Sequence, residues 1–444
     1  MGPVTAGHII EPTSPVAVDL AVNGYAEQEF FASGTATAYQ PSKPLQSDGK
    51  WSVKAQSSAP YRTRIVVRRP QDPSRFNGTV LVEWLNVSGG VEADADWAYL
   101  NPEIVRAGYA YVGVSAQAFG VNGGHALLGA PGVAPSGGLV GAEPARYATL
   151  THPGDQYAYD MFSQIGRALR GSAQPSALGS LRPGRVVGIG ESQSAFFLTT
   201  YIDALQPMQH VYDGFFVHSR GGSGAALSGQ PLGSSAVPMG LKIREDLGVP
   251  VFMFETETDV GPLLDYGPAR QPDTDRIRTW EVAGTAHADA YLVGGYAGAL
   301  GCNFTINEGP QHNVVQAALH AMNDWMVHGT SPPRAARLQL STTAPPVIAR
   351  DSLGNAIGGV RTPAVDVPVA ALSGIAPAGA STLCSLFGST MPFDGSTLMR
   401  LYHDKSGYLS SYEASLGKAI AGGFLLSADR TALLQQASGV QFST

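Results

Sequence analysis

Short apolar runs alternate with segments of helical periodicity between residues 79 and 328. The clearest runs are 79–85, 109–115 and 185–189, and the clearest helix is 156–170, where apolar side chains recur every four residues. Strands that alternate with helices form βαβ units, in which the strands lie parallel and helices cover the sheet. The alternation therefore predicts an α/β protein with a mostly parallel central sheet.

The turn after the run at 185–189 carries the most specific signal in this part of the chain. Residues 190–194 (GESQS) match the G-x-S-x-G pattern of a nucleophile elbow, except that Ser194 replaces the last glycine. Small residues are expected at both ends of the pattern, since strand and helix approach each other closely around the serine. Chance occurrence is one alternative. A dinucleotide-binding loop is another, but the third glycine of G-x-G-x-x-G would fall at Gln193. Ser192 is the candidate nucleophile.

A serine nucleophile needs a base and an acid that orients the base, and in chains with this elbow the order is serine, acid, histidine. The apolar run at 250–254 is followed by Glu257 and Asp259. We favour Asp259 as the acid because it lies far enough after the strand to be on the loop, where the acid of such a triad usually lies. Glu257 remains the alternative. His287 follows the short run at 280–282 and fits the order as the base, whereas His218 precedes both carboxylates. For either carboxylate the alternatives are a solvated loop carboxylate or a cap of the next helix, and for His287 the alternative is a structural histidine.

Two backbone N–H groups should bind the oxyanion that forms during acyl transfer. One belongs to Gln193, directly after the candidate nucleophile, and the other to the glycine-bearing loop at 86–90, around Val87. The alternative for this loop is an ordinary turn. The chain has no H-E-x-x-H motif and no cysteine pair with zinc spacing, so neither a metal nor a cofactor is expected.

We expect a catalytic domain at 1–334, with cap-like insertions at about 117–156 and 219–240, and an appendage of a hairpin and helices at 335–444. A long stretch without periodicity, such as 117–156, usually covers a functional site. The apolar residues of the insertions favour an uncharged, moderately hydrophobic ester, unless they only pack the loops; they are Phe119, Leu127, Leu128, Leu139 and Leu227.

Composition excludes several classes of partner. The net charge of −7 and the lack of a basic stripe argue against nucleic acid, and no run approaches eighteen apolar residues, as a membrane helix would require. No signal peptide is recognised in the chain as given, so we expect a cytoplasmic protein, or a secreted one if a leader has been removed. Cys302 and Cys384 are expected as two buried thiols, with a single disulfide as the alternative. The oligomeric state stays open.

Several motifs together resemble a bacterial family known as "alpha/beta hydrolase domain" proteins. They are 190–195 (GESQSA), 152–155 (HPGD), 159–164 (YDMFSQ), 280–289 (WEVAGTAHAD), 83–88 (EWLNVS) and 386–393 (LFGSTMPF). The resemblance extends from about residue 25 to 440. It implies an α/β-hydrolase fold and a serine-dependent ester hydrolase, in a family where serine is usual at position 194. It implies no particular substrate.

The residues and the resemblance together predict a carboxylic-ester hydrolase that works through an acyl-enzyme. Ser192 would attack the acyl carbon, His287 would take its proton, and Asp259 would hold the imidazole in the right tautomer. The alternatives are an acyltransferase or a lactone or amide hydrolase with the same residues, and a non-catalytic binding module of the same fold.

Overall fold

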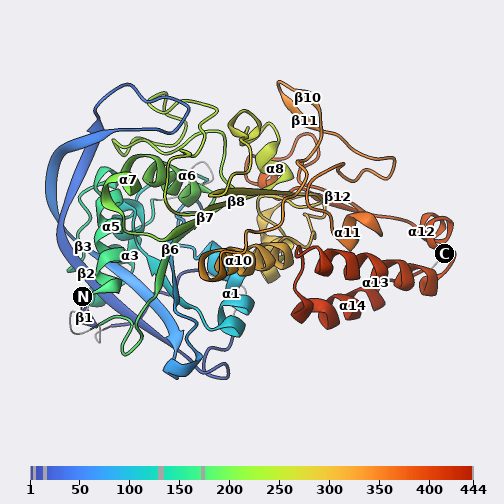
Figure 1. The fold of residues 1–444 in the computed structure, drawn as a ribbon, viewed down its shortest axis with the longest axis horizontal. Coiled ribbons are helices and arrows are strands. Elements are labelled where there is room, and N and C mark those ends of the chain that lie inside the picture. The colour runs from blue at the N-terminus through green and yellow to red at the C-terminus, as the bar shows by residue number, and fades with distance from the viewer. Residues whose placement is uncertain (1, 4–6, 14–17, 129–134, 172–175, 443–444) are drawn as a thin grey trace. The chain divides into compact units, whose positions relative to one another are not determined.

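The computed structural model describes residues 2–3, 7–13, 18–128, 135–171 and 176–442. Part of the predicted insertion at 117–156, namely 129–134, lies outside the described residues. The chain divides into two compact units (Figure 1). The first unit comprises Met1–Val251 and Pro268–Ile277, and the second comprises Phe252–Gly267 and Arg278–Thr444. The predicted boundary at residue 334 remains a prediction.

A twisted sheet forms the centre of the first unit, with the strand order β1-β2-β3-β5-β4-β6-β7. Strands β2 and β3 form a long antiparallel hairpin, β3 pairs antiparallel with β5, and β5, β4, β6 and β7 run parallel. The mostly parallel sheet predicted from the sequence is thereby confirmed. The bounds are β1 Gly2–Pro3, β2 Tyr25–Pro41, β3 Val53–Pro70, β4 Thr79–Trp84, β5 Ala110–Val114, β6 Arg185–Glu191 and β7 Gly214–His218.

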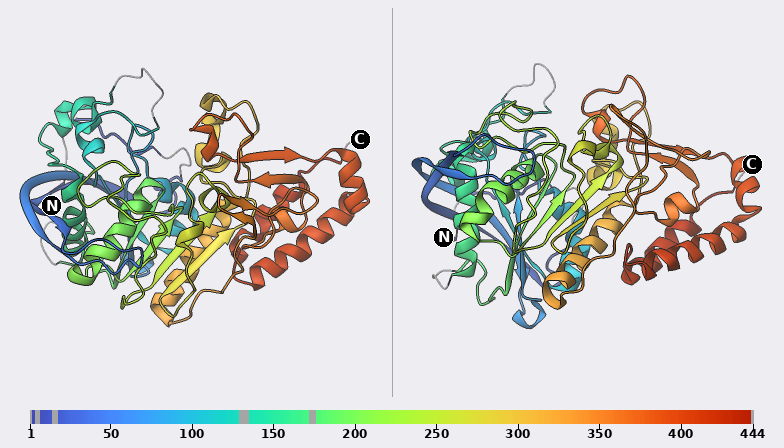
Figure 2. Two further views of the ribbon diagram at one scale, coloured as in Figure 1. Left: turned by 90° about the horizontal axis from the view of Figure 1, so that it is seen from above. Right: turned by 45° about the horizontal axis from the view of Figure 1, so that its top comes forward.

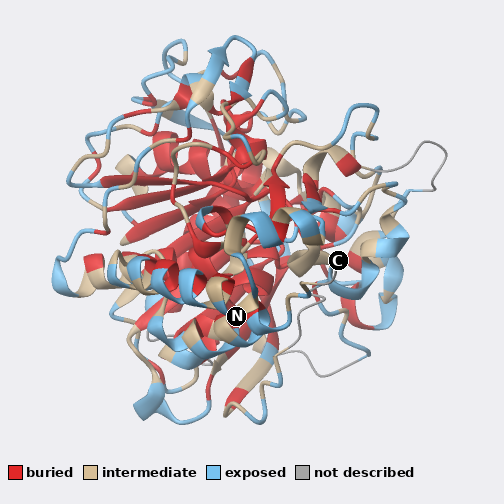
Figure 3. Cartoon of the chain, turned by 90° about the vertical axis from the view of Figure 1, so that its right-hand side faces the viewer, coloured by how far each residue is buried: buried red, intermediate tan, exposed pale blue. Residues whose placement is uncertain are grey.

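The parallel strands read as almost continuous apolar runs because helices cover both of their faces. All residues of β4, β5 and β7 are buried, and buried residues, red in Figure 3, fill the strands. Figure 1 shows α1 (Ala95–Ala107) on one side of this sheet, and α5 (Ala158–Arg170) and α6 (Gln193–Thr200) on the other. The ring of Trp84 on β4 lies 5.1 Å from those of Phe162 on α5 and Phe197 on α6. This aromatic layer fixes α6, the helix that follows the candidate nucleophile, on the sheet.

The two predicted insertions differ in structure. The described part of 117–156 contains the short helices α2 (Ala118–Asn122), α3 (Gly138–Ala142) and α4 (Pro144–Tyr147), and η2 (Asp155–Tyr157) leads into α5. Residues 219–240 form neither helix nor strand. Helix α6 continues through a π-helical turn at Tyr201–Leu205 into α7 (Gln206–Gln209).

The second unit contains the neighbouring strands β8 and β9 and, after them, a set of helices and two small hairpins. The paired helices α13 and α14 end the chain and are red in Figure 2. The first residues of β8 and β9, Val251 and Ile277, belong to the first unit. The bounds are β8 Val251–Thr256, α8 Glu257–Val260, β9 Ile277–Val282, α9 Ala290–Val293, α10 Gln311–His328, β10 Leu340–Thr343, β11 Pro346–Ile348, α11 Pro363–Asp366, β12 Ala370–Ser373, β13 Ser389–Pro392, α12 Gly395–Tyr402, α13 Lys405–Ala421 and α14 Arg430–Ser438.

One expectation for the second unit was wrong, and it concerns the two cysteines. Cys302 and Cys384 form a disulfide rather than two thiols. This bond joins segments far apart in the sequence, because the two cysteines are 82 positions apart.

Candidate active site

Ser192 lies at a sharp turn between β6 and α6 in the first unit. Its backbone has φ 57° and ψ −123°, a combination that a residue with a side chain adopts only at a cost of about 1–3 kcal/mol. The Ser192 N–H donates to the carbonyl of His218 at the end of β7 (3.0 Å), and the Ser192 carbonyl accepts the N–H of Ala195 (2.9 Å). Strand and helix together therefore hold a half-buried serine in a strained conformation.

Both ends of the elbow need small residues, as the sequence predicted. A Cβ atom on Gly190 would lie 3.1 Å from the Cβ of Ser194 and 3.2 Å from its backbone. The Ser194 side chain is fully buried, and its hydroxyl has no hydrogen-bond partner among the described residues. Ser194 thus takes the glycine's place as a small packing residue.

The loop at 86–90 follows β4 and contacts the residue after the candidate nucleophile. Asn86 and Ala93 exchange two backbone hydrogen bonds (2.9 and 2.8 Å), which close the loop. The Val87 N–H donates to the side-chain oxygen of Gln193 (3.2 Å), and the Ser88 hydroxyl lies 3.4 Å from the same oxygen. Val87 and Gln193, whose backbone N–H groups are the predicted oxyanion donors, are therefore in contact. The side-chain oxygen of Gln193 accepts the Val87 N–H.

Asp259 and His287 form a buried pair in the second unit. Asp259 lies on α8, directly after β8, and His287 follows β9. The Asp259 Oδ1 and the His287 Nδ1 are 2.7 Å apart, and both side chains are almost fully buried. Thr256 caps α8 and donates its N–H (2.6 Å) and its hydroxyl (2.8 Å) to Asp259 Oδ2.

These contacts define the protonation state of the pair. Burial raises the pKa of Asp259, but the charge of His287 and the hydrogen bonds from His287 and Thr256 outweigh it and hold that pKa below its ordinary value. An ionised carboxylate can only accept hydrogen bonds, so the His287 Nδ1 carries a proton and donates it. In a neutral imidazole the lone pair is then on Nε2, which can take up a proton.

Glu257, the alternative acid, has other partners. Its Oε1 accepts the N–H of Gly284 (2.6 Å), and its Oε2 accepts Arg350 Nη2 (2.8 Å) and the N–H of Gly374 (3.0 Å). Its carboxylate is thus bound by a charged side chain and two backbone groups, which is the environment of a structural anion. The histidine pairs with Asp259 and not with Glu257.

A second buried histidine–aspartate pair, which was not predicted from the sequence, lies in the first unit. His218 Nδ1 lies 2.8 Å from Asp96 Oδ1, and both side chains are completely buried. The Asp96 N–H donates to Glu83 (2.9 Å), and burial, together with the charges of Asp96 and Asp94, raises the pKa of Glu83 well above its ordinary value. Because His218 is inaccessible to solvent, this pair supports the strand end beneath Ser192. His218 and Asp96 are 122 positions apart, and no local pattern joins them.

The apolar residues predicted to line a pocket are only partly gathered. Phe119 and Leu139 line a cavity of about 120 Å³ beside the loop at 86–90, with Gly90 and the paired Arg64 and Glu92 in its wall. Leu227 is buried, Leu128 is half-buried, and Leu127 is 53% exposed. Among the described residues there is no cluster of histidine, cysteine and carboxylate side chains that could hold a metal. None of the helices described is long and apolar enough to span a bilayer.

Fold and sequence together define the family. The family described as "Alpha/beta hydrolase domain" matches residues 1–435, and the chain belongs to it. The α/β-hydrolase fold expected from the sequence is therefore confirmed, and the protein belongs to a family of hydrolases.

Solved structures show only distant likeness. An α/β serine hydrolase without a lid from Xanthomonas campestris is 9% identical, with a TM-score of 0.29 over 52% of this chain and 81% of the other. The esterase Est22 is 12% identical (TM-score 0.28; 55% and 65%), and a carboxylesterase from Lactobacillus plantarum is 12% identical (TM-score 0.27; 53% and 77%). None of the curated proteins matches the chain. Likeness at this level carries no information on function.

Proposed function

We propose that the protein is a serine-dependent carboxylic-ester hydrolase, with Ser192 as the nucleophile, His287 as the base and Asp259 as the acid that orients it. The observation that carries the proposal is Ser192 itself, which is held in a strained conformation at the tip of a strand-to-helix turn. Strain of this kind in a non-glycine residue is concentrated at functional sites. The buried Asp259–His287 pair supports the proposal because it leaves Nε2 of the imidazole as the proton acceptor.

In the proposed reaction the Ser192 hydroxyl attacks the acyl carbon of the ester while His287 Nε2 takes its proton. The tetrahedral intermediate collapses, the bond to the alkoxy group breaks, and the leaving alcohol takes the proton from His287. A water molecule then attacks the acyl-enzyme in the same way, with His287 again as base. The acid leaves and the Ser192 hydroxyl is restored.

The oxyanion of each intermediate would be bound by the backbone N–H groups of Val87 and Gln193. The Gln193 N–H lies in the first turn of α6, where N–H groups have no carbonyl partner within the helix. The Val87 N–H already binds an uncharged amide oxygen, that of the Gln193 side chain. A substrate oxyanion carries more charge than this amide oxygen and would take its place, while the Gln193 side chain moves aside.

The cavity beside this loop supports an uncharged, moderately hydrophobic substrate. Phe119 and Leu139 supply apolar surface, and the charges of Arg64 and Glu92 in its wall compensate each other. Glu11 also lines the cavity, and its pKa, raised to about 7 by burial and by Glu27, favours the uncharged carboxyl group below that pH. The disulfide between Cys302 and Cys384 favours an oxidising compartment over the cytosol.

The hydrolysis of p-nitrophenyl acetate and butyrate by the native protein, S192A and S194A tests the proposal. We expect the native protein to hydrolyse at least one ester, S192A to lose at least about a thousandfold in kcat, and S194A to stay within a few-fold of the native rate. Added alcohol that yields a new ester would support the acyltransferase alternative instead. Turnover by S192A at the native rate would refute the proposal.

A further inference from the structure

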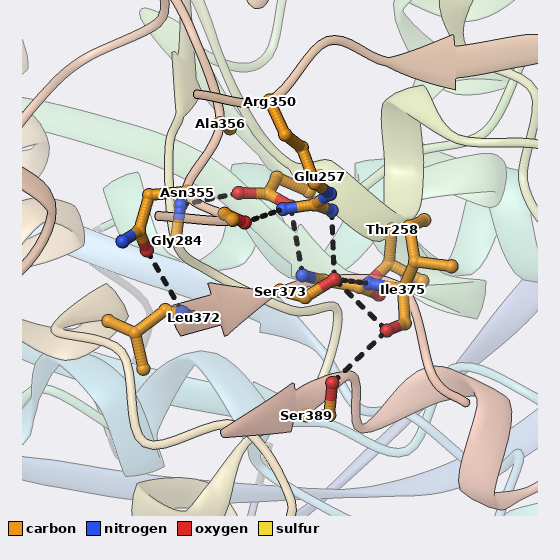
Figure 4. A network of polar contacts seen from close by, with 12 residues as sticks. Glu257, Thr258, Gly284, Arg350, Asn355, Ala356, Leu372, Ser373, Ile375 and Ser389 are labelled. Carbon is orange, nitrogen blue, oxygen red and sulfur yellow. Dashed lines mark hydrogen bonds and ion pairs between the residues drawn. The ribbon is translucent and has the colours of Figure 1, made fainter. Parts of the chain in front are cut away.

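One hydrogen-bond network joins the turns that carry Asp259 and His287 to the C-terminal part of the chain (Figure 4). Glu257, two residues before Asp259, lies at its centre. Its carboxylate accepts Gly284 N–H from the turn before His287, and Arg350 and Gly374 from the C-terminal part. Three segments far apart in the sequence thus meet at one buried carboxylate.

A second set of hydrogen bonds runs parallel to the first. The His287 backbone N–H donates to the Thr258 hydroxyl oxygen (3.0 Å), and this hydroxyl donates to the Gly374 carbonyl (2.5 Å). Gly374 is therefore held at its N–H by Glu257 and at its carbonyl by Thr258. A Cβ atom on Gly374 would lie 2.4 Å from the Thr285 carbonyl oxygen and 2.7 Å from the Thr258 nitrogen, so only glycine fits there.

Arg350 supplies the positive charge of this network. Its Nη2 donates to Glu257 Oε2 (2.8 Å) and to the Ser373 hydroxyl oxygen (2.8 Å), and its Nη1 donates to the Gly354 carbonyl (3.1 Å). The Glu257 side chain is completely buried, whereas that of Arg350 is 26% exposed. A buried carboxylate that loses its cation is strongly destabilised. We expect it to move, and its other hydrogen-bond partners to move with it.

We propose that Arg350 is a positioning residue for the Asp259–His287 pair and that it acts through Glu257, Thr258 and Gly374. The proposal rests on the function proposed above. Gly284 and His287 donate to Glu257 and Thr258, and these two residues also bind Gly374 of the C-terminal part, so the distance between acid and base depends on that part. Residues 335–444 are then a necessary support of the active site.

Kinetics of R350M and R350K test the proposal, with R430M as the matched control. Arg430 forms an exposed ion pair with Glu413 on the terminal helices and lies outside the network. We expect R350M to lower kcat about 10- to 100-fold with KM unchanged, since small misplacements of catalytic groups have effects of this size. The acid limb of its kcat/KM profile should move to lower pH because the imidazolium loses part of its carboxylate partner. R350K should recover part of the loss, and R430M should behave like the native protein.

The proton NMR signal of the Asp259–His287 hydrogen bond provides a readout that needs no substrate. The downfield resonance should be present in the native protein and R430M, and weakened or shifted in R350M. This result would support the positioning role even if none of the tested esters were hydrolysed. The positioning role would be overturned if R350M matched R430M in kinetics, pH profile and resonance. If S192A had lost turnover in the same experiments, the proposed function would still stand.

Thr258 offers a second test in case R350M does not fold. T258V keeps the shape of the side chain but removes both of its hydrogen bonds, whereas T258S keeps the hydroxyl. We expect T258V to lower kcat at least about tenfold, and T258S to recover most of the loss. Equal kcat in T258V, T258S and the native protein, with equal circular dichroism spectra, would overturn the proposal.

Discussion

Replacement of Asp259 by asparagine changes one atom and should reverse the tautomer of His287. The Thr256 N–H is a buried donor that must find an acceptor, and it lies 2.6 Å from Asp259 Oδ2. The single oxygen of an asparagine amide will therefore face Thr256, and its NH2 group will face His287 Nδ1. Nδ1 must then accept a hydrogen bond, so the proton moves to Nε2, which no longer has a lone pair for the Ser192 proton.

The size of the effect follows from this reversal. The same change in a serine protease, which also produces the wrong tautomer, lowers kcat by about 10⁴. We expect D259N to lower kcat by about 10³ to 10⁴, which corresponds to about 4–5.5 kcal/mol of transition-state stabilisation. KM should change little because Asp259 is completely buried and cannot contact the substrate. E257Q should cost only about 10- to 100-fold, since Glu257 acts through positioning alone.

Steady-state kinetics with a p-nitrophenyl ester, at the pH optimum of the native protein, measure both variants. Circular dichroism and thermal unfolding show whether each variant is folded. A thousandfold or greater loss of kcat in E257Q, with D259N within tenfold of the native protein, would refute the assignment of Asp259 as the acid. Glu257 would then be the acid, and the observed pairing of Asp259 with His287 would be structural.

Three further predictions concern stability. S194A should keep or raise the thermal unfolding midpoint, since it removes a buried hydroxyl that has no hydrogen-bond partner; a fall of several degrees would show that the hydroxyl is bound. The double variant C302S/C384S should lose about 2–4 kcal/mol of unfolding free energy in a urea titration, and an unchanged midpoint would argue against the disulfide. Partial burial and a hydrogen bond with Glu27 raise the pKa of Glu11 to about 7. Its protonated form therefore stabilises the fold below about pH 4.5, and this stabilisation is lost as the pH rises through about 7. E11Q should flatten the pH dependence of the unfolding free energy, measured by urea titration, over this pH range. A pH dependence in E11Q as steep as in the native protein would contradict the raised pKa.

The sequence allowed prediction of the features that depend on local chemistry. The elbow at Ser192 needs a strand, a tight turn with small residues and a helix within about fifteen positions, and all of these leave a local pattern. The parallel strands were recognisable for a similar reason, because strands covered on both faces are uniformly apolar. Strand ends differed from the expected ones by a few residues, as at β6, which extends to Glu191.

The choice of the acid depended on contacts that no local pattern shows. Glu257 and Asp259 are two residues apart, and they differ because Arg350, 93 positions later, binds the first. One local signal did exist: Thr256 and Asp259 form a capping box, which turns the Asp259 side chain back toward the start of α8. The Cys302–Cys384 bond left no signal of this kind, because its partners meet only through the packing of the folded second unit.

Covalent labelling tests the central claim most directly. The native protein, S192A and S194A are each treated with a fluorophosphonate, digested and sequenced by mass spectrometry. We predict one adduct on Ser192 in the native protein and in S194A, none in S192A, and loss of ester hydrolysis in proportion to labelling. An adduct on another residue, or full hydrolysis by a protein that is not labelled at Ser192, would contradict the account.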